Sequence, residues 1–204
     1  MDPCIVIGNG PSLNDVPLEF LEKYDTFGSN RIYTHFTPTF YVSVNPLVIE
    51  QCLEDIKAVK SEEKFISSAF SVAVPGSTPL YSTNMPIFSR NPLERVYEGF
   101  TVTFVSLQLA FYYEYDPVLL VGVDHRYKYS GNPNEEQVFQ GDDPNHFDPN
   151  YFKGMKWNLP DLARSEQAYK MAETVYSHEG RRIINLGPDS ALNVFAKEDL
   201  KDWL

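Results

Sequence analysis

The chain has few cysteines and no long apolar run. Only two cysteines occur in 204 residues, so neither a disulfide framework nor a zinc site built on cysteine is available. We expect Cys4 in a buried strand and Cys52 in a helix, as in a reducing compartment. No apolar run approaches the ~20 residues that span a bilayer, and the N-terminus carries Asp2 instead of a basic region. These features predict a cytoplasmic protein without a signal peptide or transmembrane segment.

Positive charge is also scarce. The chain has 17 Lys and Arg against 28 Asp and Glu, a formal net charge of −11. Such an acidic protein is a poor binder of nucleic acid and of anionic membranes. A small anionic ligand is still compatible with it, because a local field can oppose the global one. The arginines that could create such a field are Arg31, Arg90, Arg95 and Arg126.

Short apolar runs alternate with helical patterns, and there is no internal repeat. This alternation predicts one α/β domain over residues 1–204, with a mostly parallel sheet flanked by helices. The expected strands are Cys4–Ile7, Thr26–Gly28, Phe40–Val44, Lys64–Ile66, Val118–Val121 and Arg182–Ile184. The expected helices are Pro46–Lys60, Thr101–Tyr115 and Asp161–Glu179, with a shorter one after Pro188.

Two stretches, 71–98 and 127–158, are irregular and rich in proline or glycine. The second is longer than an ordinary connection between elements. Segments of this kind often cover substrates. We therefore predict a lid-like segment at about 127–158 that is mobile without ligand and closes over a bound one. A disordered loop is the alternative.

The first strand runs into the turn Gly8-Asn9-Gly10-Pro11-Ser12. In parallel α/β sheets, ligands bind beyond the carboxyl ends of the strands. Glycines let the backbone approach a ligand closely. A helix that begins at Pro11 would offer free N–H groups and a partial positive charge to a phosphate. We therefore predict nucleotide contacts from Gly8, Asn9, Gly10 and Ser12. A tight turn with no ligand is the alternative.

Asparagines follow three successive expected strands, as Asn9, Asn30 and Asn45. An amide both donates and accepts hydrogen bonds, so it can bind ribose, base or phosphate. Asparagine also favours turns, but three at one sheet edge indicate a nucleotide crevice. The turn is not the usual dinucleotide fingerprint, because a third glycine is missing and no acidic residue follows the second strand.

A fourth strand end carries Gly122 and Asp124, in the stretch VLLVGVDHRY. The Asp124 carboxylate is placed to accept a hydrogen bond from a hydroxyl or from a base amine. A helix cap or turn residue is the alternative for Asp124.

Four stretches together resemble the bacterial lipooligosaccharide sialyltransferases: GNGPSL, GSNRIY, YVSVNP and GFTVTFVSLQLAFYYEYDPVLLVGVD. They also resemble a wider related group of uncharacterised proteins, motility accessory factors and archaeal pterin diphosphokinases. INLGPDSALNVF is similar to the closing segment of the family, so the likeness covers most of the chain. The resemblance implies a Rossmann-like fold and an inverting, metal-independent transfer from a CMP-activated sugar to a glycan acceptor. It also implies a role in lipopolysaccharide biosynthesis.

The resemblance assigns residues by position. Asn9 and Asn30 would contact the phosphate and ribose of the donor, and Thr101 the sugar. Gly122 and Asp124 would lie near the cytidine. The chain departs from the family at Gly99, Val102 and Arg126, where the family has arginine, serine and tyrosine. The nucleotide half is thus matched more fully than the sugar half.

The catalytic base of the family is a histidine in a loop before the long penultimate helix, and His146 in GDDPNHFDPNYF matches it. Neutral imidazole can accept a proton near pH 7. His125 is a rival base, because it follows Asp124 directly. Tyr127, Tyr129, Arg126 and the first-turn amides would stabilise the leaving phosphate.

Two other functions stay open. A diphosphokinase acting on a pterin-like alcohol would need ATP and a Mg²⁺ held by residues such as Asp124 or Asp142. A nucleotide-binding protein without transferase chemistry is the other, motivated by Gly99 and Val102. DDPNHFD offers three carboxylates and an imidazole, but its spacing matches no zinc motif. We expect no resident metal or cofactor, since the donor is a co-substrate. The oligomeric state is left open, a homo-oligomer included.

Overall fold

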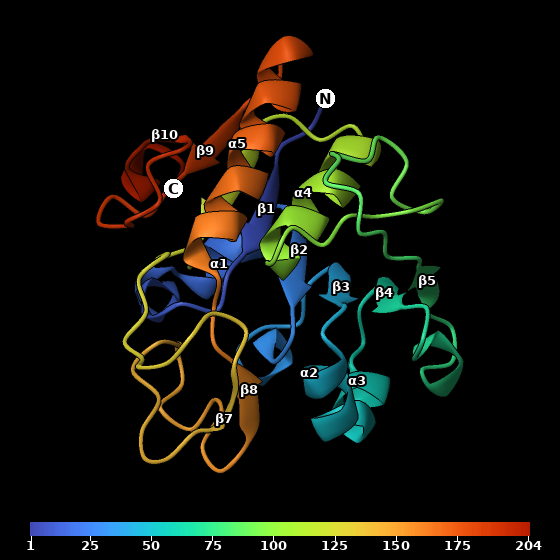
Figure 1. The fold of residues 1–204 in the computed structure, drawn as a ribbon. Coiled ribbons are helices and arrows are strands. Elements are labelled where there is room, and N and C mark those ends of the chain that lie inside the picture. The colour runs from blue at the N-terminus through green and yellow to red at the C-terminus, as the bar shows by residue number, and fades with distance from the viewer.

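The computed structural model describes all residues from 1 to 204, around an eight-stranded sheet in which every neighbouring pair of strands is parallel (Figure 1). The strands lie in the order β10-β9-β6-β1-β2-β3-β4-β5. Their bounds are β1 Cys4–Ile7, β2 Asp25–Ser29, β3 Phe40–Ser43, β4 Glu63–Ser67, β5 Thr78–Leu80, β6 Val118–Val121, β9 Ile183–Asn185 and β10 Ala196–Lys197. The predicted α/β fold class is confirmed, and each expected strand is present.

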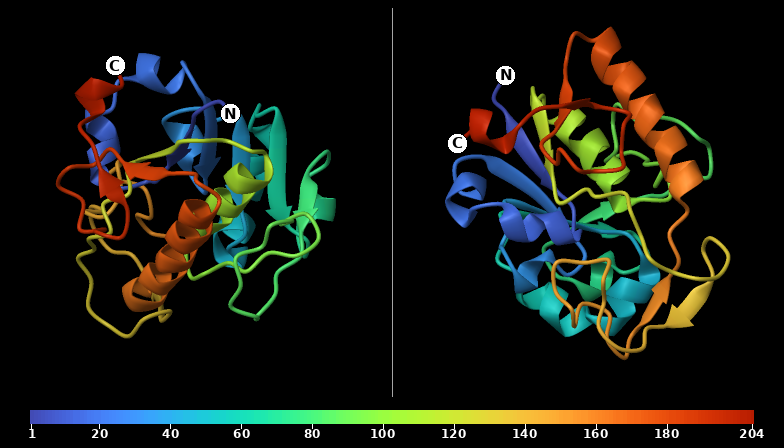
Figure 2. Two further views of the ribbon diagram at one scale, coloured as in Figure 1. Left: turned by 90° about the horizontal axis from the view of Figure 1, so that it is seen from above. Right: turned by 90° about the vertical axis from the view of Figure 1, so that its left-hand side faces the viewer.

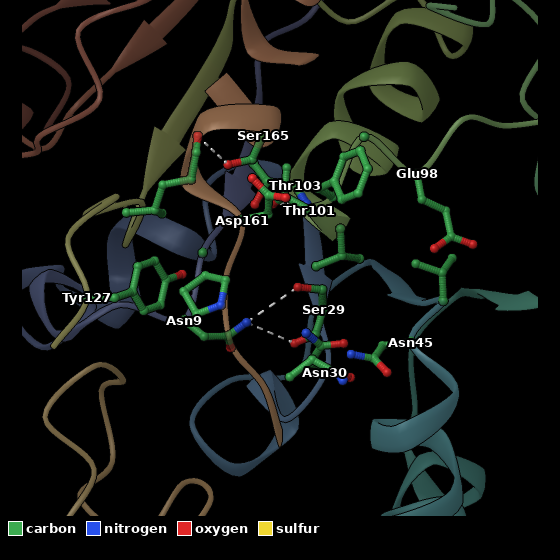
Figure 3. A pocket seen from close by; sticks show the side chains of 18 of the residues that line it. Asn9, Ser29, Asn30, Asn45, Glu98, Thr101, Thr103, Tyr127, Asp161 and Ser165 are labelled. Atoms are coloured by element: carbon green, nitrogen blue, oxygen red, sulfur yellow. Dashed lines mark hydrogen bonds between the residues drawn. The ribbon is translucent and has the colours of Figure 1, made fainter. Parts of the chain in front are cut away.

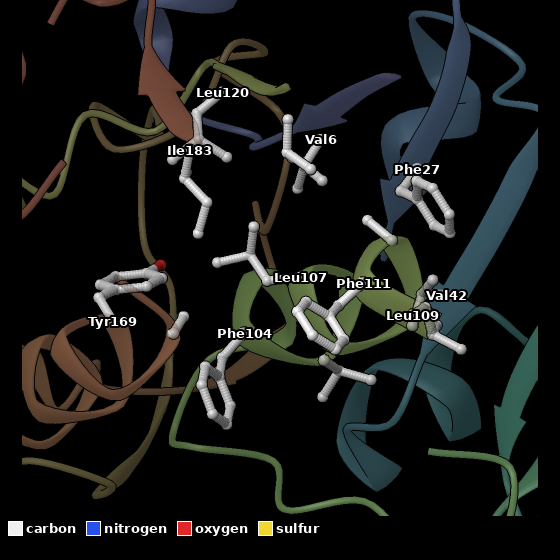
Figure 4. Packing of buried hydrophobic residues seen from close by; sticks show 14 of the residues in the cluster. Val6, Phe27, Val42, Phe104, Leu107, Leu109, Phe111, Leu120, Tyr169 and Ile183 are labelled. Atoms are coloured by element: carbon white, nitrogen blue, oxygen red, sulfur yellow. The ribbon is translucent and has the colours of Figure 1, made fainter. Parts of the chain in front are cut away.

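The sheet is buried on both faces, because successive side chains of a strand point to opposite sides. Cys4 and Val6 of β1 belong to one hydrophobic cluster, and Ile5 and Ile7 belong to a second one. This explains why the central strands are continuous apolar runs without polar alternation. Figure 4 shows the first cluster between the sheet and α4.

Two long helices, α4 (Val102–Tyr112) and α5 (Leu162–His178), pack together on the face of the first cluster (Figure 2). All residues of α4 from Thr103 to Phe111 are buried. Burial therefore outweighs the weak helix propensity of its aromatic and β-branched side chains. No helix of the structure is both long and apolar enough to span a membrane.

The opposite face is covered by α1 (Leu18–Leu21), α2 (Pro46–Gln51) and α3 (Leu53–Ala58). The single helix predicted over 46–60 is therefore wrong. The chain leaves the helical conformation at Cys52, and each half buries its own apolar residues. The helix expected after the first turn is only a 3₁₀ turn, Pro11–Asp15, followed by the single turn of α1.

The short helix predicted after Pro188 is also wrong. Residues 188–195 form a loop, followed by β10 and a 3₁₀ turn at Leu200–Asp202. The Ser190 hydroxyl donates to the Val123 carbonyl at 2.6 Å, and the Ala191 N–H donates to the Asp124 carbonyl at 2.9 Å. Hydrogen bonds to the chain beyond β6 thus take the place of helical ones.

The segment 127–158, predicted to be lid-like, contains a small two-stranded antiparallel sheet of β7 (Glu136–Val138) and β8 (Lys156–Asn158). Four of its aromatic residues join the second cluster and are at most 7% exposed; they are Phe147, Tyr151, Phe152 and Trp157. The Phe147 N–H also donates to the Asn9 carbonyl at 3.0 Å. The segment therefore packs against the first turn through an aromatic core, and its mobility stays a prediction.

Candidate active site

A cavity of about 520 Å³ opens at the carboxyl ends of the parallel strands (Figure 3). From β1 the chain adds β2 to β5 on one side and then returns to place β6 on the other. The connections that follow β1 and β6 therefore lead to strands on opposite sides of this pair, and doubly wound sheets bind their ligands at such a point. The walls come from the ends of β1, β2, β3 and β6, the N-termini of α4 and α5, and the segment 127–158.

Most of the predicted site residues meet in this cavity. The lining includes Gly8, Asn9, Gly10, Asn30, Asn45, Thr101, Gly122, Asp124, Arg126, Tyr127 and His146. Ser12 and Tyr129 do not line it. The Tyr129 hydroxyl donates instead to the Pro160 carbonyl at 3.2 Å. The structure places these residues in one cavity, and the roles assigned to them stay predictions.

The glycines of the two loops are needed by the protein itself. A Cβ on Gly8 would lie 2.4 Å from the Gly122 carbonyl oxygen, and a Cβ on Gly122 would lie 2.5 Å from the Gly8 carbonyl oxygen. Gly122 also has a φ of 66°. The two loops therefore cross in backbone contact. The sequence predicted that these glycines allow close approach of a ligand. In the structure Gly8 and Gly122 allow close approach of the two loops to each other.

The amides of the first turn are also occupied. The Gly10 N–H donates to the Gly122 carbonyl at 2.8 Å, and the Ser12 N–H donates to Oδ2 of Asp124 at 3.1 Å. Asp124 therefore caps the 3₁₀ turn with one carboxylate oxygen, which was the alternative for this residue. The expectation that the Gly10 and Ser12 amides are free for a phosphate is wrong, because both donate to the loop that follows β6.

The three asparagines present different groups to the cavity. Asn9 Nδ2 donates to the carbonyl and hydroxyl oxygens of Ser29 at 3.3 and 3.4 Å, which leaves its Oδ1 buried without a partner. Asn30 Oδ1 is likewise buried and unpaired. Asn45 Oδ1 caps α2 by accepting from the Leu47 N–H at 3.0 Å, which leaves its NH₂ group available. Buried acceptors without a partner cost about 1–3 kcal/mol each, so a ligand with hydroxyl or amine donors would relieve this cost.

Backbone strain is concentrated at the cavity. Asn30, Phe100, His125 and Asn134 all have φ between 50° and 65° and line it; Glu114 is the one other non-glycine residue with positive φ. Each left-handed non-glycine residue costs about 1–3 kcal/mol, and such residues cluster at functional sites.

His146 is paired with a buried carboxylate that sequence reasoning did not identify as its partner. Asp143 Oδ2 lies 2.8 Å from Nδ1 of His146, and the Asp143 side chain is fully buried. Asp143 Oδ1 accepts from the Asn145 N–H at 2.9 Å. Because the carboxylate accepts the Nδ1 proton, the lone pair of neutral His146 lies on Nε2. The spacing of three residues was the available signal, but a loop sequence does not reveal which acid faces the ring.

Aromatic rings hold the His146 imidazole in place. The Tyr151 ring is stacked on it at 4.1 Å with planes 5° apart, and Phe152 and Trp157 meet it edge-on. The Tyr151 hydroxyl accepts from the Arg31 N–H at 3.1 Å. Since Arg31 follows Asn30, Tyr151 connects the histidine to the asparagine wall of the cavity.

His125 lines the same cavity in a different environment. Its side chain is 9% exposed, and its Nε2 lies 3.9 Å from a Glu166 carboxylate oxygen. Burial lowers the pKa of His125, and the neighbouring Glu166 opposes that change only in part. Nearby, burial raises the pKa of Tyr127, so its hydroxyl is a neutral donor. The Arg126 guanidinium donates to the Asp189 carbonyl at 3.1 Å.

No protein-family model matches the chain, and no curated protein matches it significantly. Solved structures do resemble it. The MAf glycosyltransferase from Magnetospirillum magneticum AMB-1 has a TM-score of 0.64 and 12% identity, over 98% of this chain and 34% of that one. The sialyltransferase CstII from Campylobacter jejuni has TM-scores of 0.54 with CMP-3FNeuAc and 0.57 with cytidine-5'-monophosphate. Both CstII structures are 16% identical over 97% of this chain and cover 86% and 84% of that chain.

The chain spans about a third of the MAf glycosyltransferase and most of CstII. At these identities the likeness shows the fold: this chain has a sialyltransferase-like α/β fold that is shared with solved glycosyltransferases.

Proposed function

We propose that this protein is an inverting, metal-independent glycosyltransferase that uses a CMP-activated, sialic-acid-like sugar as donor and a glycan as acceptor. The observation that supports it most is the pairing of His146 with buried Asp143 in a cavity that also presents unpaired asparagine oxygens. The fold shared with CMP-bound CstII supports the nucleotide. The resemblance to lipooligosaccharide sialyltransferases suggests an acceptor on a lipopolysaccharide.

The asparagines and the helix ends would bind the donor. Asn9 and Asn30 offer acceptors, which suit the hydroxyls of ribose better than phosphate oxygens. Asn45 offers a donor, and α4 begins on the cavity wall at Val102, just after Thr101. The first N–H groups of a helix lack helical acceptors and favour an anion. Tyr127 and Arg126 would add donors to the leaving phosphate.

His146 would act as the general base. Its Nε2 takes the proton of the acceptor hydroxyl as that oxygen bonds to the anomeric carbon. The bond from this carbon to the phosphate oxygen breaks on the opposite face, and its electron pair leaves with CMP. The Nδ1–H donated to Asp143 stabilises the imidazolium that forms. The segment 127–158 would keep water from the activated sugar.

CMP or CDP is expected to stabilise the fold more than AMP or GMP, because the site is proposed to read cytidine. At a hundredfold excess over Kd the gain in free energy of unfolding would be about 2.7 kcal/mol. A thermal-shift titration measures this, with each nucleotide tested with and without EDTA. Equal shifts for all nucleotides, or no shift, would contradict the CMP assignment.

Asn9→Ala and Asn30→Gly are each expected to weaken CMP binding by about 1–3 kcal/mol, since each removes a hydrogen bond to the ligand. Glycine is chosen at position 30 because it adopts the φ of 53° without strain. Isothermal titration measures the affinity. Asn14→Ala is the control, because its amide bonds the Phe147 carbonyl at 2.9 Å outside the cavity lining. If the apo melting temperature collapses while the affinity of the folded fraction is unchanged, the amides are structural.

The two alternative functions predict different results. A diphosphokinase would bind ATP with Mg²⁺ in preference to CMP. No group of three or more His, Cys, Asp and Glu side chains gathers in the structure, although Mg²⁺ can be held by one carboxylate and substrate phosphates. A non-catalytic protein would bind CMP and show no turnover of CMP-sugar, even with an acceptor present.

A further inference from the structure

Phe100 combines two costs at the mouth of the cavity. Its φ is 61°, directly after Gly99 at 62°, and a bulky side chain rarely adopts this conformation. The residue is also 41% exposed, although burial of a Phe side chain is favourable. Glycine at this position would remove both the strain of the left-handed backbone and the exposure of an apolar side chain. Their coexistence on a cavity wall indicates that the exposed ring has a use.

Two side chains contact the Phe100 ring. The Arg164 guanidinium carbon lies 4.9 Å from its centroid, and the Tyr97 ring meets it edge-on at 6.5 Å. Thr101, the next residue, caps α4 by accepting from the Thr103 N–H. Phe100 is therefore an apolar side chain that lies two residues before a helix whose own residues are packed in the core.

Polar groups lie on the same part of the cavity wall. Glu98 lines it, and its carboxylate accepts from the Ser82 hydroxyl. Thr83 and Asn84 follow in the lining. An apolar ring beside carboxylate, hydroxyl and amide groups matches a pyranose, which has an apolar C–H face and a rim of hydroxyl donors.

We propose that Phe100 and Glu98 form a pyranose subsite, in which the sugar packs its C–H face on the Phe100 ring and donates a hydroxyl to the Glu98 carboxylate. This deepens the proposed function and rests on it, because such a transferase binds two sugars, one on the donor and one on the acceptor. The shared chemistry is a hydroxylated pyranose, and the experiment distinguishes its source.

Saturation-transfer NMR with a panel of methyl glycopyranosides tests the subsite directly. We expect at least one glycoside to receive saturation at its C–H protons from the wild-type protein and from Phe100→Tyr. Phe100→Gly is expected to reduce that signal about tenfold, the loss typical of an aromatic contact. It should not lower the melting temperature, since glycine relieves the backbone strain. Tyr112→Ala is expected to keep the signal, because Tyr112 is a similarly exposed residue, at 38%, that lies outside the cavity lining.

The source of the pyranose follows from adding a CMP-sugar. Loss of the glycoside signal assigns the subsite to the donor sugar, and its persistence assigns it to the acceptor. Absence of glycoside binding to the wild type, or equal signals from Phe100→Gly and wild type, would overturn the subsite. A different result would contradict the proposed function but not the subsite. In that case glycoside binding would depend on Phe100, and CMP would give no thermal shift.

Discussion

Replacement of His146 by alanine is expected to lower kcat by about 10²–10⁴ with little change in donor affinity. The imidazole lies on the cavity wall with its Nδ1 on Asp143 and its ring stacked on Tyr151. Its removal takes away the group that accepts the proton of the acceptor hydroxyl but none of the proposed nucleotide contacts. Steady-state kinetics with a CMP-sugar and an acceptor measure kcat and KM separately.

Asp143→Asn is the matched variant, because it keeps the shape of the side chain while an amide N–H can face Nδ1. It should lower kcat as well, since an amide N–H facing Nδ1 favours the tautomer that carries its proton on Nε2, which then cannot accept a proton.

His125→Ala is expected to retain the transferase activity that His146→Ala loses. Full transferase activity in His146→Ala would move the role of base to His125. Burial lowers the pKa of His125, so a His125 base would keep working to lower pH than an ordinary histidine.

Gly122→Ala is expected to lower the free energy of unfolding by about 2–5 kcal/mol. The left-handed backbone contributes about 1–2 kcal/mol of this cost, and the forced separation of two loops contributes about 1–3 kcal/mol more. The new Cβ would lie 2.5 Å from the Gly8 carbonyl oxygen, and a backbone atom cannot move aside as a flexible side chain does. Urea unfolding followed by circular dichroism measures the difference from wild type.

Gly180→Ala is the matched control. Its φ of 69° is close to the 66° of Gly122, yet a Cβ there would meet nothing within 4 Å. The control isolates the cost of the backbone conformation, about 1–2 kcal/mol. If Gly122→Ala is too unstable to purify, the soluble fraction on expression and limited proteolysis replace the urea measurement. Equal destabilisation by the two variants would show that the contact between the Gly8 and Gly122 loops is not a constraint.

The core strands could be predicted because burial on both faces leaves a local signature. Cys4–Ile7 and Val118–Val121 are continuous apolar runs, which a strand covered on both faces requires. The edge strands β5 and β10 have only three and two residues and carry no such signature. The grouping of Asn9, Asn30 and Asn45 was also predictable, since each follows a strand and parallel strands end at one edge.

Other features depend on partners that are far away in sequence. The Pro46–Lys60 pattern is helical by period, yet packing divides it at Cys52. Residues after Pro188 have hydrogen-bond partners on the chain beyond β6 and therefore form a loop. One carboxylate oxygen of Asp124 accepts from the Ser12 N–H. Asp124, expected to contact a ligand, is therefore partly a structural cap.

The sequence by itself determined the parallel α/β class, the central strands and the place of the crevice, because these follow from local apolar patterns and from strand order. Only the tertiary structure decided which atoms face the cavity. Ser29 orients the Asn9 amide, Asp143 selects the free nitrogen of His146, and Gly99 and Phe100 in left-handed conformation expose an aromatic ring. Each of these depends on the direction of a hydrogen bond or a backbone torsion, and these are set by packing between distant segments.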